Sequence, residues 1–497
     1  MGTNYSPHVV SIHILDDDSL LNIFYLYRPF FLGEDEKDIK HIQGGGGHWK
    51  RGRWWYGLAH VCQRWRNLIL GSVSHLRLSL ICTNGTPVQN MLAHSPPLPL
   101  TVDYSSDDSI TAEDEEGVLL ALEQRHRVRH LRLIFPAQNL RKLVMAIDEE
   151  FPILEYLIVG PPRSLMGDGI ALMLPETLQT PNLHHFTLTC FTCSIQPRLH
   201  PISASLVTLY LVINHQSAYF PPNILLQWTS FMPQLEILAI VFTFPVPNRD
   251  VERQLTHTPI TTHITLPVLR LFWFQGVSAY LEALVCRITA PRLKDLRIQL
   301  FKQLTFSVPR LAQFMNTTMN IMFNDVVIMF KDKQINLSMV SRGGDMYAFG
   351  VTVGCGHLDW QVSSMAQVFN ALSQVFFAVR RLTLRHDVHG QSSEEHNDVD
   401  RIEWRNLLRP FILARTPVVE NGLVEQLSRC LRLENGERPL ELLPELRCLL
   451  YYYSGSGDSG DAFTPFVDAR QNVGRPVTLV SHHSRQRRSP SRPLALS

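Results

Sequence analysis

The feature that most constrains the fold of this chain is a short pattern that recurs along it. A proline is followed by apolar residues at the second, fifth and seventh positions after it, and the copies begin at Pro152, Pro181, Pro233, Pro267, Pro291 and Pro444. Further copies without the proline centre on Leu131, Leu209 and Leu382. From 131 to 296 the central apolar residues are 23 to 34 positions apart, a period typical of repeat proteins.

Each repeat predicts one strand and one helix. The last two apolar residues of the pattern lie two positions apart, as side chains on one face of a strand do. Between copies, residues 139–150 carry Leu140, Leu143, Val144 and Ile147 at helical spacing. We expect the proline of the next copy to end each helix and to direct the chain into the next strand.

A lone strand and helix cannot bury their apolar faces, but stacked neighbours can. The sequence therefore predicts a mixed α/β solenoid of leucine-rich repeats, shaped like a horseshoe with the strands on its concave side. The alternative is a generic α/β domain with leucine-rich strands. The regular spacing and the absence of a glycine-rich phosphate turn after a strand favour the solenoid. A chain of 497 residues is also too long for one compact core.

We place the repeat domain at residues 76–450 and expect it to be degenerate at 300–378. The step from Leu296 to Leu382 is long enough for about three degraded repeats. Strands are expected there at 326–330 and 347–353. Residues 451–482 are expected to form a linker and a C-terminal cap. Residues 483–497, rich in Arg, Ser and Pro, predict a disordered tail that could act in nuclear import.

Residues 12–75 do not follow the repeat and predict a small helical module. Asp17 or Asp18 can cap a helix over 19–26, and a second helix with a continuous apolar stripe is expected from about residue 55 to 70. Between them lies a polar loop, 31–53, with four consecutive glycines. A module of this size is marginally stable alone, so its apolar helices should pack on the first repeat or on a partner protein.

The two helices of this module resemble a known motif. Residues 14–24 and 58–69 look like the two halves of an F-box, and the more specific half contains Val61-Cys62-Gln63-Arg64-Trp65-Arg66. Up to about residue 482 the chain resembles the F-box/leucine-rich-repeat proteins of fungi. It departs from them in two ways. Asp16 follows Leu15 where an F-box usually has a proline, and the loop between the halves is longer than usual.

The resemblance implies a non-catalytic substrate receptor of an SCF-type ubiquitin ligase. Its F-box would bind the Skp adaptor, and through it the cullin–RING ligase, while its repeats would bind an unknown substrate protein. About half of the residues at F-box positions should pack inside the module instead. The adaptor-binding candidates carried over by position are Leu15, Leu20, Leu21, Phe24, Leu58, Val61, Cys62 and Trp65. The alternative is a leucine-rich-repeat interaction scaffold whose degenerate F-box no longer binds the adaptor.

The repeat pattern also predicts where a substrate would bind. Side chains that flank the central apolar residue of each strand should point to the concave face. The candidates are His130, Arg132, Tyr156, His185, Tyr210, Trp273, Arg297 and Arg381. Trp273 is the most suggestive, because a large apolar ring on an exposed strand face is costly without a partner. The alternative is that a loop or the 300–378 segment covers Trp273.

Other functions lack support in the sequence. Cys190 and Cys193 have the spacing of zinc ligands, but no second pair lies at a matching distance. The segment Gly457–Gly460 resembles a serine-protease nucleophile loop, but no histidine and acid can be placed opposite it. We therefore expect no metal, no cofactor and no enzymatic activity. The net charge of +1 provides no global field for nucleic acid or a membrane.

The sequence shows neither an apolar stretch long enough to span a bilayer nor a secretory signal. Its eight cysteines are scattered, which is typical of reduced intracellular thiols. We expect a protein of the cytoplasm, the nucleus or both. Gly2 and Ser6 match a loose myristoylation pattern, and one acyl chain would anchor the protein only marginally.

Overall fold

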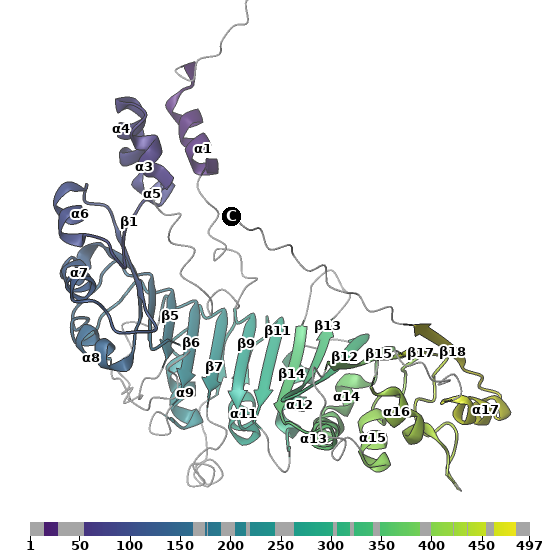
Figure 1. Ribbon diagram of the computed structural model, residues 1–497. Coiled ribbons are helices and arrows are strands. Elements are labelled where there is room, and N and C mark those ends of the chain that lie inside the picture. Colours follow the sequence, from purple (N-terminus) through teal and green to yellow (C-terminus); the bar gives the residue numbers. More distant parts are fainter. Residues whose placement is uncertain are drawn as a thin grey trace, which may run out of the picture. The chain divides into compact units, whose positions relative to one another are not determined.

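Figure 1 shows the computed structural model. It describes residues 14–27, 54–162, 174–175, 177–189, 204–214, 219–243, 263–301, 306–318, 323–340, 348–387, 399–420, 422–434, 436–453 and 462–483. The chain divides into two compact units, Met1–Leu206 and Val207–Ser497, and each is described by itself below. Within the described ranges, every helix is too short or too polar to cross a lipid bilayer.

Unit 1 begins with short helices and continues as alternating strands and helices. Its strands run parallel in the order β1-β2-β3-β4-β5. They are β1 (Leu80–Thr83), β2 (Leu100–Ser105), β3 (Val128–Ile134), β4 (Tyr156–Gly160) and β5 (His185–Thr189). The helices are α1 (Asp17–Tyr27), α3 (Trp54–Ala59), α4 (Gln63–Gly71), α5 (Val73–Leu76), α6 (Val88–His94), α7 (Ala112–Glu123), the 3-10 turn η3 (Arg125–Arg127) and α8 (Ala137–Met145).

Unit 2 carries a longer sheet with its helices on one face (Figure 1). Its strands are β6 (Thr208–Ile213), β7 (Ile237–Phe242), β9 (Leu271–Gly276), β11 (Asp295–Leu300), β12 (Asp325–Lys331), β13 (Gln334–Val340), β14 (Ala348–Gly354), β15 (Arg381–Asp387), β16 (Thr416–Val419), β17 (Cys448–Tyr453) and β18 (Thr478–His483). A separate parallel pair is formed by β8 (Ile264–Thr265) and β10 (Ile288–Thr289). The helices are α9 (Pro222–Thr229), α11 (Ser278–Val285), α12 (Pro309–Thr318), α13 (Leu358–Ala371), α14 (Ser373–Phe376), α15 (Arg401–Leu408), α16 (Val424–Leu431) and α17 (Thr464–Asn472).

The repeat pattern correctly predicts the strands and their register. In unit 1, Leu131 pairs with Leu157, which pairs with Phe186. In unit 2 the corresponding register line is Leu209, Leu238, Phe272 and Leu296. All seven side chains are at most 2% exposed. The apolar residues of the pattern therefore form the core face of each sheet, and the fold is mixed α/β with long runs of parallel strands. The horseshoe curvature stays a prediction.

The segment predicted to hold about three degraded repeats is different. Strands lie where we expected two of them, at β12 and β14, but the sheet order here is β11-β14-β13-β12-β15. The strand β13 is antiparallel to both β12 and β14. Buried residues alternate along both arms of the tight β12–β13 turn, as in Val326, Ile328 and Phe330 and then Ile335 and Leu337. Such an alternation across a short turn favours a hairpin over a helix-containing repeat.

Two helix boundaries differ from the expectations. The helix predicted over 139–150 ends at Met145, because Asp148–Glu150 would place negative charge at the negative end of its dipole. The prolines therefore lie in turns after the helices rather than ending them. The second helix of the N-terminal module is broken into α3 and α4, and Cys62 caps α4 by accepting from the Trp65 N–H at 3.5 Å.

Residues 451–482 were expected to form a linker and a C-terminal cap. In the structure α17 is followed by β18, which pairs in parallel with β17. The sheet of unit 2 thus runs to His483. The glycine- and serine-rich stretch 454–461 and the basic tail from residue 484 lie outside the described residues.

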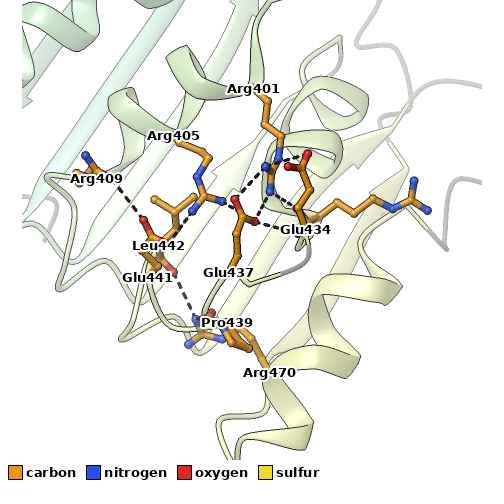
Figure 2. A network of polar contacts seen from close by, with 10 residues as sticks. Arg401, Arg405, Arg409, Glu434, Glu437, Pro439, Glu441, Leu442 and Arg470 are labelled. Carbon is orange, nitrogen blue, oxygen red and sulfur yellow. Dashed lines mark hydrogen bonds and ion pairs between the residues drawn. The ribbon is translucent and has the colours of Figure 1, made fainter.

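Figure 2 shows the polar contacts that hold the last repeats together. Arg405 on α15 forms ion pairs with Glu437 at 3.2 Å and Glu441 at 3.0 Å, both on the segment after α16. Arg401 also pairs with Glu437, and this contact lowers the pKa of Glu437 to about 2. These pairs tie α15 to the segment that leads into β17.

Arg470 of α17 is fully buried and has no described carboxylate within ion-pair distance. Its two Nη atoms donate to the backbone carbonyls of Pro439 at 3.3 Å, Leu443 at 3.2 Å and Pro444 at 2.9 Å. Figure 2 shows Arg470 beside Pro439. Leu443 has a φ of 49°, a left-handed conformation that is costly for a residue with a side chain. The guanidinium therefore holds a strained turn in place from the inside.

Candidate interaction surfaces

The N-terminal helices form a small packed cluster. Phe24 of α1 contacts Trp65 of α4 edge-on, with ring centroids 4.9 Å apart. Arg64 donates from Nη2 to Asp17 Oδ1 and to the carbonyl of Leu15, both at 2.7 Å. The helices α1 and α4 are thus joined by one aromatic contact and one arginine, although 28–53 between them lies outside the described residues.

Asp16 stands where an F-box usually has a proline, and it caps α1. Its Oδ1 accepts from the Ser19 N–H at 2.7 Å, and this hydrogen bond lowers the pKa of Asp16. We expected Asp17 or Asp18 to cap this helix. Both a proline and an aspartate are favourable at a helix start, so the departure from the motif preserves the beginning of the helix.

The adaptor-binding candidates separate into buried and accessible side chains. Leu20 and Phe24 are at most 1% exposed, so they pack the module and face no partner in this structure. Val61 is 59% exposed. The half-buried candidates are Leu15, Leu21, Leu58, Cys62 and Trp65.

Sequence reasoning missed three exposed apolar residues of the same module. Ile14 is 75%, Ile23 43% and Leu26 73% exposed. The helical spacing of Leu20 and Phe24 could have shown that these two share the inner face of α1, since residues four apart lie above one another. Ile23 and Leu26 lie off that line. The module therefore presents apolar side chains that it does not bury itself.

In unit 1 the sheet face opposite the core carries a row of rings. His130, Tyr156 and His185 are register partners on β3, β4 and β5. The ring centroids of His130 and Tyr156 are 6.1 Å apart, and those of Tyr156 and His185 are 5.5 Å apart. The Thr101 hydroxyl on β2 lies 3.3 Å from His130 Nδ1. Four of the predicted substrate-binding residues, these three and Arg132, lie together here.

This row carries little net charge at neutral pH. Burial lowers the pKa of His130 to about 4 and also lowers that of His185, so both imidazoles are neutral at pH 7. Arg132 donates to Asp103 Oδ1 at 2.7 Å, and Asp103 is only 4% exposed. Burial raises the pKa of Asp103, while Arg132 opposes that rise. The surface offers stacked rings and one internal ion pair. These features suit the binding of another protein better than the binding of an ionic ligand.

In unit 2 the corresponding face carries an apolar cluster. Tyr210, Val212, Ala239 and Val241 are buried, and the half-buried Trp273 packs against them. The rings of Tyr210 and Trp273 meet edge-on at 5.7 Å. Tyr210 is only 6% exposed, so its prediction as a substrate contact does not hold in this structure. Trp273 packs on β6 and β7 through this cluster.

The remaining candidates are exposed arginines with local partners. Arg297 on β11 pairs with Asp295 of the same strand at 2.6 Å. Arg381 on β15 lies 3.8 Å from Asp325 on β12, a long and weak pair. Between β11 and β15 lie three strands, β14, β13 and β12. Arg297 is the register partner of Trp273 on β9, whereas Arg381 lies apart from the other candidates of unit 2.

Among the described residues, no group of three or more His, Cys, Asp or Glu side chains is placed to hold a metal ion. Cys190, Cys193 and the segment Gly457–Gly460 lie outside the described residues.

Comparison with protein-family models and with curated proteins gives no match. Among solved structures, the crystal structure of the leucine-rich repeat-containing protein LegL7 from Legionella pneumophila is similar with a TM-score of 0.27 and 13% identity. The similarity covers 71% of this chain and 86% of that chain. A similarity this low leaves the family of the chain open.

Proposed function

We propose that the chain is a non-catalytic substrate receptor of an SCF-type ubiquitin ligase. The N-terminal module would bind the Skp adaptor, which connects to the cullin–RING ligase. The leucine-rich repeats would bind the protein to be ubiquitinated, in the cytoplasm or the nucleus. One observation supports this most directly: a small helical module leaves Ile14, Ile23, Leu26 and Val61 exposed.

Apolar side chains on so small a module call for a partner. Clustered exposed apolar residues mark interaction sites, and a module this small is marginal without further burial. Val61 belongs to the segment that resembles the more specific half of an F-box. Trp65 in that segment packs on Phe24 at 4.9 Å and so supports the helix that follows Val61.

The first test is co-purification of the full chain with the Skp adaptor. We expect Val61→Asp to lose the adaptor, because it places a charge on an exposed apolar contact without disturbing packing. The matched control is Met145→Asp on α8, where the native side chain is similarly exposed at 64%. Trp65→Ala is a poorer variant, because it removes the packing of Phe24 as well. Equal recovery of the adaptor by both variants would contradict the assignment of Val61.

The second candidate function is a repeat scaffold that binds no adaptor. The observation in its favour is Asp16, which stands where an F-box usually has a proline. The same experiment decides between the two, since failure of the unaltered chain to recover the adaptor would leave the scaffold.

Substrate capture has its own test. Trp273→Ala should leave the chain folded. Proteins that crosslink to the chain are identified by mass spectrometry, and we expect a set of them to be missing with this variant. Trp360→Ala on α13 is the matched control, because Trp360 is 45% exposed on a helix of the same unit. A set unchanged by Trp273→Ala would rule out this ring as an anchor.

A further inference from the structure

The turns that lead into the parallel strands are closed by a common hydrogen bond. The N–H of the fourth residue of the turn donates to the carbonyl of the first, as from Leu154 to Phe151 at 3.3 Å and from Leu293 to Ala290 at 3.1 Å. Such a turn favours proline at its second position, because the ring fixes the φ that this position needs. The prolines at this position are Pro152, Pro181, Pro233, Pro267, Pro291 and Pro444.

Two consecutive turns have a large apolar residue at the proline position instead. Phe377 lies before β15 and Ile412 before β16, in turns closed by the same hydrogen bond at 3.0 and 3.2 Å. Phe377 is 43% and Ile412 48% exposed. Neither residue fixes φ as proline does, and neither side chain is buried, so the needs of the turn and of the core do not explain them. Apolar side chains that lie uncovered on neighbouring turns indicate a contact with something outside the chain.

Three arginines lie on the same edge of the sheet. Arg380, Arg415 and Arg447 directly precede β15, β16 and β17, which are neighbouring parallel strands (Figure 1). None of the three forms an ion pair within the described part of the chain. Arg380 and Arg447 are exposed, and Arg415 is half-buried. We call these arginines, together with Phe377 and Ile412, the turn patch.

The described carboxylates around the turn patch leave its positive charge in place. Of the described residues in the three turns before β15, β16 and β17, Glu445 alone is acidic, and its charge acts on the buried Arg470. Asp325 on β12 pairs with Arg381 rather than with an arginine of the patch. The turn patch therefore combines exposed apolar side chains with unpaired cations.

We propose that the turn patch docks on an anionic lipid surface. In interfacial binding, apolar side chains enter the boundary between headgroups and acyl chains, while cations stay among the anionic headgroups. Phe377 and Ile412 supply the apolar contacts, and the three arginines supply the charge. A protein partner would need an apolar pocket beside a matching set of carboxylates, whereas mobile anionic lipids adjust to arginines on strands about 4.8 Å apart.

This docking depends on local charge. The net charge of +1 attracts no membrane over a distance, but each arginine near an anionic surface strengthens binding about fivefold. The inference uses the turns and charges of unit 2 alone. It does not rest on adaptor binding, so failure of the adaptor experiment and failure of the lipid experiment are separate results.

The test is co-sedimentation of the full chain with vesicles. One set contains phosphatidylcholine and phosphatidylserine, and the other contains phosphatidylcholine alone. We expect binding to the first set, and a loss of about fivefold with Arg447→Gln. Phe377→Ser should lose about tenfold, because it removes a buried apolar contact. The matched control is Ile402→Ser on α15 of the same unit, where the native side chain is 62% exposed; it should bind as the unaltered chain does.

Ile412→Pro separates lipid docking from a role in folding. It restores the residue that the turn favours, so the variant should melt at or above the temperature of the unaltered chain while losing about tenfold in vesicle binding. Soluble glycerophosphoserine should not displace the chain, since it offers no apolar phase to Phe377 and Ile412.

Four results would overturn the proposal. They are no binding to the anionic vesicles, equal binding to both vesicle sets, displacement by glycerophosphoserine, and unchanged binding by both Phe377→Ser and Ile412→Pro. The last result would assign the binding to another basic segment, such as the arginine-rich stretch 483–497. The first would leave the turn patch to a protein partner.

Discussion

Replacement of Arg470 by methionine should loosen the C-terminal end of unit 2. Three of its hydrogen bonds to carbonyls are 3.3 Å or shorter. Hydrogen bonds to a charged group contribute about 1.5–3 kcal/mol each, while burying the guanidinium costs several kcal/mol. The difference is a loss of about 2–4 kcal/mol in the free energy of local opening. The strained φ of Leu443 adds to the drive to open, because without Arg470 its carbonyl keeps only the hydrogen bond from the Leu446 N–H at 3.0 Å among the described contacts.

Hydrogen exchange measured by mass spectrometry is the suitable assay, since a stack of repeats opens locally rather than in one step. Peptides from 436–453 and 462–483 should exchange about 30- to 1000-fold faster in Arg470→Met, while β6–β11 stay unchanged. Arg475→Met is the matched control. Burial lowers the pKa of Arg470, and repulsion by the exposed Arg475 lowers it further, so removal of Arg475 should not speed exchange. Unchanged exchange in Arg470→Met would refute the reasoning.

Two further predictions concern unit 1. The pKa of His130 is lowered to about 4 in the folded chain, so its neutral form contributes stability that is present above about pH 6.5 and is lost as the pH falls toward 4. The protection of β3 against hydrogen exchange, corrected for the intrinsic pH dependence of amide exchange, should therefore fall between pH 7.5 and 5 and fall less in His130→Asn; an equal fall in both would argue against the lowered pKa. A Cβ added at Gly160 would lie 2.5 Å from the Cβ of Thr189, so Gly160→Ala should cost about 1–3 kcal/mol in chemical denaturation. Partial rescue by Thr189→Gly is expected, and no rescue would place the strain elsewhere.

The strands could be predicted from the sequence because the same pattern of apolar residues recurs many times. Each copy predicts the same register, so one irregular copy does not change the prediction. The β12–β13 hairpin was harder, since the long gap between Leu296 and Leu382 suggested missing repeats. The period-two alternation in Val326–Phe330 was visible, but the direction of a strand is set by its turn and not by its own residues.

The candidate surfaces were predictable only in part, because exposure depends on tertiary packing. The flanking positions correctly placed the ring row of unit 1 on the sheet face opposite the core, and its contact with a partner stays a prediction. Tyr210 at such a position of unit 2 is buried.

The reversed strand β13 has a consequence for how unit 2 folds. Parallel ladders run on either side of it, from β6 to β14 and from β12 to β18, and β13 joins them through antiparallel pairing alone. In repeat stacks, cooperativity passes from neighbour to neighbour. Loss of this one strand would uncouple two blocks that each retain their own ladder. A partly folded intermediate would then break at β13, and the parallel pairing from β15 to β18 would remain whole in the C-terminal block.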